Sequence, residues 1–191
     1  MRGLSVGQWA SLSQDFPMDP LDDEGWQLRE SLWKAIGVPA FKMWWRDWRE
    51  DALATPMRGL EVLDKDAIGQ LGEDLAAQFL RRREMMRVLR RNFRAPKGGE
   101  VDIVCRHDDT LAFVEVKTRT STAFGRPLDA VDAEKQQLIA RGGLEWVRLL
   151  TRTDVLFRFD VVEVILTEGK RPDIQRIPNA FQLPDNYYLQ G

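Results

Sequence analysis

The chain has 191 residues, of which 30% are charged and 43% hydrophobic, and its formal net charge is −2 at pH 7. This profile is typical of a globular domain, and no segment approaches the roughly 18 uninterrupted apolar residues of a membrane span. One Cys and one His exclude internal disulfides and a zinc site built from Cys and His. The first residues lack the apolar segment of a signal peptide, so we expect a protein of the reducing cytoplasm.

Charge is distributed unevenly along the chain. Residues 1–66 contain twelve acidic and eight basic side chains, whereas residues 81–97 contain eight basic side chains and one acidic one, Glu84. Such a basic patch can attract nucleic-acid phosphates even on an acidic protein, although a solvated helix end and a strand rim would have the same composition. The candidate nucleic-acid contacts in this patch are Arg87, Arg90, Arg91, Arg94 and Lys97.

The N-terminal third has its own pattern. Residues 1–21 show weak periodicity and contain two prolines, which predicts an irregular segment. Helical spacing of apolar residues follows over 22–36 and 41–48, the second segment with tryptophans interleaved with arginines. Such side chains could stack on unpaired bases, but an amphipathic helix packed on its own core has the same stripe. We interpret residues 1–65 as a Trp-rich helical extension.

A helix is predicted from Asp66 to Arg82. Its apolar residues recur every three or four positions, and Asp64 or Asp66 could cap its first turn. Glu73 lies on this helix among glycines and alanines. Small neighbours let that side approach another backbone or a ligand closely, so Glu73 is predicted to point into a site.

Strands and a second helix follow. Apolar alternation predicts strands over 85–94, over the two halves of 98–119 and over 156–166, with a short edge strand at 174–181. Residues 129–150 have helical spacing that the Gly142-Gly143 pair is predicted to interrupt. The order helix, three strands, helix, strand predicts an α/β sandwich with a mixed central sheet.

The two strands within 98–119 turn charged side chains toward the interior. A period of two places Glu100 and Asp102 on one face of the first strand, with Val101 and Ile103 on the other. On the second strand, Glu115 and Lys117 share a face with Leu111 and Phe113. Burying such groups is costly unless they are paired or bind a metal, so this region is the candidate site.

Three carboxylates, those of Glu73, Asp102 and Glu115, are predicted to converge on Mg²⁺ or Mn²⁺, because hard divalent cations prefer oxygen ligands. Such an ion would polarise a phosphoryl oxygen and lower the pKa of a bound water. Lys117 would stabilise the negative charge that develops beside that water, and Gly98-Gly99 would let a phosphate backbone approach closely. The alternative is that these are rim charges engaged in salt bridges.

Several segments resemble one known family. They are GEDLAAQFL at 72–80, LRRNFR at 89–94, GEVDIV at 99–104, FVEVKTR at 113–119, RFDVV at 158–162 and IPNAF at 177–181. These motifs resemble the YraN family, which is endonuclease-like, has the PD-(D/E)xK restriction-endonuclease-like fold and is similar to archaeal Holliday junction resolvases. The resemblance covers about residues 67–181.

The resemblance implies a restriction-endonuclease-like α-β-β-β-α-β core and metal-dependent hydrolysis of DNA, branched structures included. Residue by residue, it implies metal ligation by Glu73, Asp102 and Glu115. It implies Lys117 as the catalytic lysine, with Glu100 and Lys135 as auxiliary acidic and basic residues. Val101 stands where the motif that names the superfamily has proline.

We therefore expect an extension over 1–65, a nuclease-like domain over 66–182 and a tail over 183–191. The expected partners are nucleic acid, DNA foremost, a second copy of the chain in a homodimer, and a protein bound by the Trp-rich extension; no membrane is expected. Two other functions are open. One is a nucleic-acid-binding accessory protein with little or no catalysis, and the other is a protein-interaction module.

Overall fold

The computed structural model describes residues 52–120, 132–150 and 154–183. The predicted helices over 22–36 and 41–48 lie outside these residues. Within residues 52–64, the 3-10 helices η1 (Ala52–Ala54) and η2 (Leu60–Val62) precede the main domain. The main elements are α4 (Lys65–Arg82), β1 (Arg87–Arg94), β2 (Glu100–His107), β3 (Thr110–Arg119), α5 (Ala133–Leu149), β4 (Leu156–Ile165) and β5 (Asp173–Phe181).

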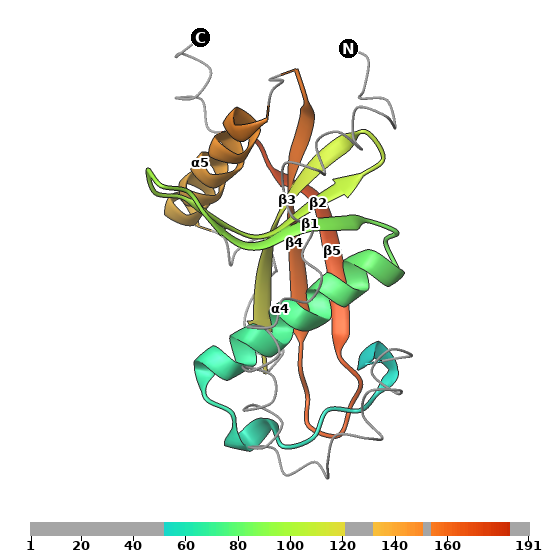
Figure 1. The fold of residues 1–191 in the computed structure, drawn as a ribbon. Helices are drawn as coiled ribbons and strands as arrows, with labels where there is room; N and C mark the ends of the chain where they lie inside the picture. The colour runs from blue at the N-terminus through green and yellow to red at the C-terminus, as the bar shows by residue number, and fades with distance from the viewer. Residues whose placement is uncertain (1–51, 121–131, 151–153, 184–191) are drawn as a thin grey trace.

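The five strands of the described residues form one mixed sheet in the order β1-β2-β3-β4-β5. Strands β1, β2 and β3 form an antiparallel meander, β4 runs parallel to β3, and β5 runs antiparallel to β4. Helix α5 lies in the crossover between β3 and β4, as a parallel pair requires. The α/β architecture, the mixed sheet and the edge strand at β5 are therefore confirmed (Figure 1).

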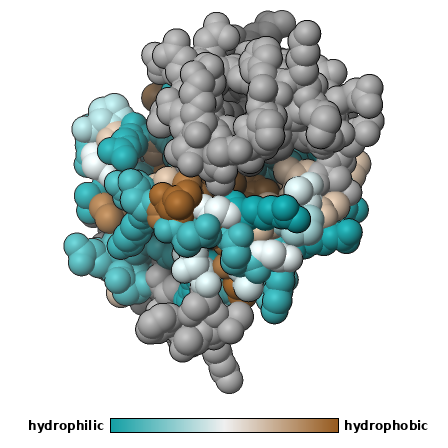
Figure 2. Space-filling view, turned by 90° about the horizontal axis from the view of Figure 1, so that it is seen from below, coloured by the Kyte–Doolittle hydropathy of each residue, from teal (hydrophilic) through white to brown (hydrophobic). Residues whose placement is uncertain are grey.

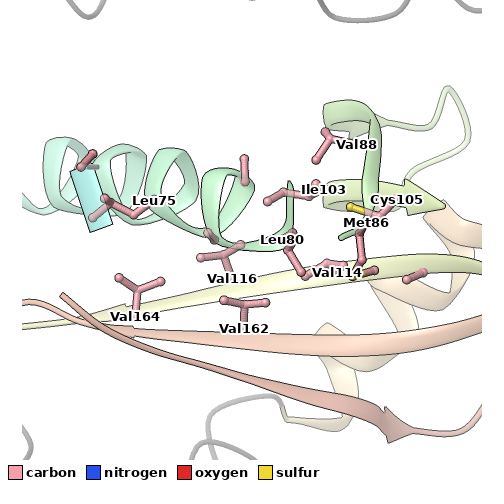
Figure 3. Close-up of a cluster of buried hydrophobic side chains, with 14 of the residues drawn as sticks. Leu75, Leu80, Met86, Val88, Ile103, Cys105, Val114, Val116, Val162 and Val164 are labelled. Atoms are coloured by element: carbon pink, nitrogen blue, oxygen red, sulfur yellow. The ribbon is translucent and has the colours of Figure 1, made fainter. Parts of the chain in front are cut away.

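Among the described elements, α4 packs against one face of the sheet and α5 against the other. Along β3 the side chains alternate as predicted, with Ala112, Val114 and Val116 toward α4 and Leu111 and Phe113 toward α5. The cluster on the α4 side is drawn in Figure 3, where Leu75, Leu80, Met86, Val88, Ile103, Cys105, Val162 and Val164 join the β3 valines. The cluster on the α5 side is rich in aromatic rings, such as Phe93 against Trp146 with centroids 5.0 Å apart.

Helix α4 begins where its sequence predicts. The side chain of Asp64 accepts a hydrogen bond from the backbone N–H of Ala67 over 2.8 Å, so Asp64 is the N-cap. Further along, the helix comes very close to β3, because a Cβ at Gly72 would lie 1.8 Å from Oγ1 of Thr118. This contact holds the neighbouring Glu73 against the sheet.

Helix α5 runs without a break through Gly142 and Gly143, so the predicted interruption is wrong. The two glycines serve close packing instead. A Cβ at Gly142 would lie 3.0 Å from the backbone of Glu100, and a Cβ at Gly143 would lie 2.7 Å from the ring of Phe113. Gly99, with φ of 111°, meets the backbone of Gly142 in the same way. Gly99 therefore accommodates α5, and the approach of a phosphate backbone to Gly98-Gly99 stays a prediction.

The alternation of side chains between the two faces of the sheet is interrupted at Asn92 on β1 and at Asp102 on β2. Val101 packs on the α5 side, whereas Ile103 packs on the α4 side, and its partner Arg91 also reaches toward α4. Asn92 has φ of 50°, in the left-handed region that Asn tolerates better than most residues. The prediction that Val101 and Ile103 share a face is therefore wrong, because the period of two does not hold through this kink.

A buried ion network joins β4 and β5 to the end of α4. Asp160 is fully buried and accepts hydrogen bonds from the side chains of Arg158 and Arg176 and from the backbone N–H of Asn179. Arg176 also pairs with Glu84, just after α4. With two cations and a backbone donor around it, the buried carboxylate is fully compensated.

Residues 52–63 pack against the sheet domain. Ala52 belongs to the α4-side cluster, and the carboxylate of Glu168, after β4, accepts hydrogen bonds from the backbone N–H groups of Gly59 and Leu60. Met57 exchanges backbone hydrogen bonds with the same loop. Within the described residues, no helix is long and apolar enough to cross a membrane.

Candidate active site where two strands separate

The site forms where strands β2 and β3 separate. Their pairing ends at Ile103 and Val114. Asp102 directly precedes Ile103 on β2, and its Oδ2 accepts a hydrogen bond from the backbone N–H of Val116 over 2.8 Å. The carboxylate takes the place of a backbone acceptor and links the diverging strands. It therefore lies beside β3, next to Glu115.

Glu115 is 2% exposed, within the interior of the sheet. Nζ of Lys117 lies 2.8 Å from its Oε1, and Nζ of Lys135, in the first turn of α5, lies 3.3 Å from the same atom. Lys135 also pairs with Glu100 of β2. Two ammonium groups thus neutralise one oxygen of Glu115, whereas its Oε2 is buried without a hydrogen-bond partner in the described part of the chain.

Glu73 reaches the site from α4. Nη2 of Arg91 lies 4.0 Å from its Oε2 and 2.6 Å from Oδ1 of Asp74. Like the free oxygen of Glu115, Oε2 of Glu73 is buried and accepts no hydrogen bond from a described residue. Burial raises the pKa of Glu73, and the guanidinium of Arg91 opposes this effect.

The three carboxylates act on one another electrostatically. Burial, and then the charge of Glu115, raise the pKa of Asp102 to about 8, while the hydrogen bond from Val116 works in the opposite direction. The charge of Glu73 adds to the rise. In the absence of a further cation, Asp102 therefore favours its protonated form at neutral pH.

The auxiliary pair is held in its charged form. A hydrogen bond from Lys135 lowers the pKa of Glu100. Burial would lower the pKa of Lys135, but Glu100, Glu115 and Asp102 together raise it above its ordinary value. Lys135 therefore stays cationic at neutral pH, between Glu100 and Glu115.

The donor set fits a hard divalent cation in its chemistry. Two buried carboxylate oxygens, on Glu73 and Glu115, have no hydrogen-bond partner among the described residues, and burial, together with the anionic neighbours, favours the protonated form of Asp102. The described residues nevertheless contain no group of three His, Cys, Asp or Glu side chains already arranged around a common metal position. Lys117, Lys135 and Arg91 supply the compensating charge instead.

The predicted nucleic-acid contacts have two kinds of surroundings. Four are exposed on edge strand β1 or in the turn that follows it: Arg87, Arg90, Arg94 and Lys97. Arg91 differs, because only 12% of its side chain is exposed and its guanidinium pairs with Asp74 on α4. Four of the five predicted contacts are therefore exposed at the edge of the sheet, called the rim below, and Arg91 points inward toward α4.

The pairing of Asp74 with Arg91 was not anticipated from sequence. Asp74 is buried on α4 directly after Glu73, and Nε2 of Gln70 lies 3.4 Å from its Oδ1. Arg91 faces α4 because the register of β1 shifts between Val88 and Arg90. The sequence does not indicate this register shift. For the ion pair itself, the one signal in the sequence is Asp74, the second acidic residue beside Glu73.

A separate open pocket of about 640 Å³ lies beyond the end of β3, beside the start of α4. Figure 2 views the molecule from below relative to Figure 1, and the described surface there is mostly hydrophilic, with a few hydrophobic patches. Neither Asp102 nor Glu115 lines this pocket. The carboxylate cluster is thus distinct from the pocket, whose wall includes Leu60, Lys65, Ile68, Thr118, Arg119 and Leu166.

Comparison with known proteins gives the family. The model of the "Uncharacterised protein family UPF0102" matches residues 72–164. A UPF0102 protein of Trichlorobacter lovleyi is 48% identical over 118 residues, which are 61% of this chain and 91% of the relative. UPF0102 proteins of Geobacter metallireducens and Nocardia farcinica are each 44% identical over 63% of this chain, covering 97% and 93% of the relatives.

The chain belongs to the UPF0102 family. This is the YraN family, so the resemblance seen in the sequence is confirmed. The segment matched by the UPF0102 model begins at the glycine that contacts Thr118 and includes Glu73, Asp102, Glu115 and Lys117. Strand β5 lies beyond this segment.

Proposed function

We propose that this UPF0102 protein is a metal-dependent nuclease that hydrolyses phosphodiester bonds in DNA, branched structures included, with Mg²⁺ or Mn²⁺ as cofactor. The proposal rests above all on the surroundings of Glu115. Lys117 and Lys135 share one of its oxygens, the other is buried without a partner among the described residues, and Asp102 lies beside it. This is an anionic, water-poor site with a lysine already directed into it.

The element order supports a restriction-endonuclease-like core. Helix α4, the meander β1-β2-β3, helix α5 and the parallel strand β4 follow the α-β-β-β-α-β order that the family resemblance implies. A fold alone does not fix a function, so the roles below depend on the side chains of the site.

Asp102 and Glu115 would hold the cation, with Glu73 as the third carboxylate. When bound, the ion would polarise a phosphoryl oxygen and lower the pKa of a coordinated water. Lys117, fixed by its ion pair with Glu115, would direct its ammonium at the negative charge that develops on the phosphoryl oxygens. Lys135, held by Glu100, would supply a second cation from α5.

The exposed arginines and lysine of β1 and its turn would contact the nucleic-acid backbone. Contacts of this kind fix the position of a duplex without reading its sequence. They suit an enzyme that selects DNA by shape, and acidic residues outnumber basic ones elsewhere in the chain, which disfavours DNA binding away from this rim.

A nucleic-acid-binding accessory role is the second candidate. Two observations favour it. Among the described residues, no three potential metal ligands are already grouped, and ammonium groups neutralise Oε1 of Glu115. In this case the carboxylates and lysines would form a structural ion network at the point where β2 and β3 separate, and the chain would bind DNA without cutting it.

A cleavage panel separates the two functions. Duplex, flap, four-way-junction and single-stranded DNA are incubated with the protein and Mg²⁺ or Mn²⁺. We expect cleavage of at least one substrate, and a loss of at least about 100-fold in Glu115→Gln, because Lys117 loses its ion-pair partner, Lys135 keeps only Glu100, and the cation loses a ligand. Glu145→Gln, ten residues further along α5 than Lys135 and paired with Arg148, is the matched control and should cut normally. Tight binding by the wild type without cleavage of any substrate would favour the accessory role.

A further inference from the structure

Arg91 has surroundings unlike those of the other basic residues of β1. Arg90 and Arg94 are exposed, whereas the side chain of Arg91 is 12% exposed and faces α4. In the sheet it pairs with Ile103, the residue next to Asp102. A guanidinium enclosed in this way has no open path to a DNA phosphate, although it lies close to the carboxylate cluster.

The guanidinium of Arg91 lies between two acidic side chains of α4. Its Nη2 is 2.6 Å from Oδ1 of Asp74 but 4.0 Å from Oε2 of Glu73. Asp74 is 7% exposed, so the close pair is a buried one, and Asp74 holds Arg91 in place. The longer distance restrains Glu73 electrostatically without filling the lone pairs of its oxygen.

Glu73 is thus oriented by the charge of Arg91 and by a hydrogen bond from the side chain of Asn92, but it is not saturated. Its Oε2 is buried and accepts no hydrogen bond from the described residues. The preceding residue, Gly72, fixes the helix against Thr118, so the backbone at Glu73 has little freedom to move. A carboxylate fixed at its backbone and restrained at its head is available to a cation, or to a water bound to that cation, at small entropic cost.

We propose that Arg91, anchored by Asp74, is a positioning residue that holds Glu73 toward the metal position. This inference rests on the proposed function, because it assumes that the carboxylates bind a divalent cation. Groups that orient the ligands of a metal typically change its affinity by about 10- to 100-fold when they are replaced. Arg is suited to this role because its planar guanidinium can face two carboxylates at once, whereas an ammonium acts as a single point charge.

Titration of the full-length protein with Mn²⁺ alone, followed by calorimetry, tests the proposal. Arg91→Lys keeps the charge and the pair with Asp74 but loses the planar group that also faces Glu73. We expect Mn²⁺ to bind about 10-fold more weakly. Arg90→Lys, the same change at the exposed neighbour, is the matched control and should leave the Mn²⁺ affinity unchanged. Circular dichroism establishes that both variants are folded.

A double-mutant cycle shows whether Arg91 acts through Glu73. In a Glu73→Gln background, Arg91→Lys should have no further effect on the Mn²⁺ affinity, because the group that it positions is already gone. Where Arg91→Lys does not fold, the pair Arg91→Gln and Asp74→Asn removes both buried charges together. It is expected to weaken Mn²⁺ binding while keeping the fold.

Equal Mn²⁺ affinities for the wild type and Arg91→Lys would overturn the positioning role, and so would additive effects of Arg91→Lys and Glu73→Gln. If Mn²⁺ binds the wild type and this binding is lost in Glu115→Gln, either of these two results refutes only the positioning role of Arg91 and leaves the metal site intact. A wild-type protein that binds no Mn²⁺ would overturn the metal site and this inference with it. A protein that binds Mn²⁺ and cleaves nothing would refute the nuclease proposal while leaving the Arg91 result valid.

Discussion

The carboxylate of Asp102 and the backbone N–H of Val116 form a hydrogen bond of 2.8 Å at the point where β2 and β3 cease to pair. The side chain substitutes for a backbone acceptor, so the strands can separate without leaving that N–H group unpaired. Because Val116 directly follows Glu115, the same bond brings two carboxylates together. The geometry of the candidate site thus follows from the way in which two strands part.

Replacing Asp102 with Asn should change the pH dependence of stability in the metal-free protein. The pKa of Asp102 is raised to about 8, whereas in an unfolded chain it is roughly 3.9. The folded state therefore holds a proton that the unfolded state releases, and stability falls as pH rises from about 4 to 8. Asp102→Asn should remove at least about 1 kcal/mol of this fall between pH 5 and 8, measured by urea unfolding.

Glu100→Gln is the control of opposite sign. A hydrogen bond from Lys135 lowers the pKa of Glu100 in the folded protein. The ionised carboxylate therefore adds to the free energy of unfolding above the pKa of Glu in the unfolded chain, and this contribution is lost as pH falls. A pH profile of Asp102→Asn that runs parallel to that of the wild type would contradict the raised pKa of Asp102.

Lys117→Met should separate chemistry from metal binding. The ammonium of Lys117 pairs with Glu115 but would donate no lone pair to the cation. We expect a folded protein that still binds Mn²⁺ and cleaves about 10²- to 10³-fold more slowly, since one electrostatic group is lost from the transition state. Single-turnover cleavage and Mn²⁺ calorimetry on the same sample measure the two effects. Unchanged cleavage would remove Lys117 from the mechanism.

Exposed and buried arginines of β1 should differ in the salt dependence of DNA binding. Arg90→Gln removes an exposed charge and should make the slope of log K against log salt shallower by roughly 0.9 on duplex DNA. Arg91→Gln, with Asp74→Asn to avoid an unpaired buried charge, should leave the slope unchanged because Arg91 pairs inward. The reverse pattern would place Arg91 in the DNA interface.

Substitution by Ala should have opposite effects on stability at two glycines of α4, Gly72 and Gly69. At Gly72 the added Cβ would lie 1.8 Å from Oγ1 of Thr118, so Gly72→Ala should destabilise the fold by about 1–3 kcal/mol. At Gly69 no atom lies within 4 Å of the added carbon, and Gly69→Ala should stabilise the fold by about 0.4–1 kcal/mol. Thermal unfolding compares the two, and Thr118→Ala should partly restore Gly72→Ala. Equal effects at both sites would contradict the close contact.

The buried network around Asp160 should make a large contribution to stability. Asp160→Asn leaves Arg158 and Arg176 without a full counter-charge inside the protein, so unfolding should become easier by about 3–5 kcal/mol. Glu145→Gln weakens an i,i+3 ion pair with Arg148, in which the Glu145 side chain is 15% exposed and that of Arg148 is 64% exposed, and Gln keeps an acceptor for Arg148, so stability should change by less than about 1 kcal/mol. Urea denaturation measures both; a small effect at Asp160 would show that the arginines find other partners.

Most of the architecture was predictable because it depends on local patterns. The spacing of apolar residues located α4 and the strands, and Asp64 marked the first turn of the helix. The pair Glu115 and Lys117 could be placed on one face because β3 keeps a strict alternation up to its charged end. These features require only neighbouring residues, which is why the sequence was sufficient for them.

Acidic and basic residues interrupt otherwise apolar strands, and this local pattern is enough to show which side chains could form a buried charged site. How those charges are shared depends on the packing of the folded chain. The register shift in β1 and the kink at Asn92 turn Arg91 toward α4, and helix packing brings Lys135 to Glu115. The same packing gives Gly142 and Gly143 a role inside a continuous helix. These outcomes depend on contacts between residues far apart in the chain, where steric fit and the compensation of buried charge override the local pattern.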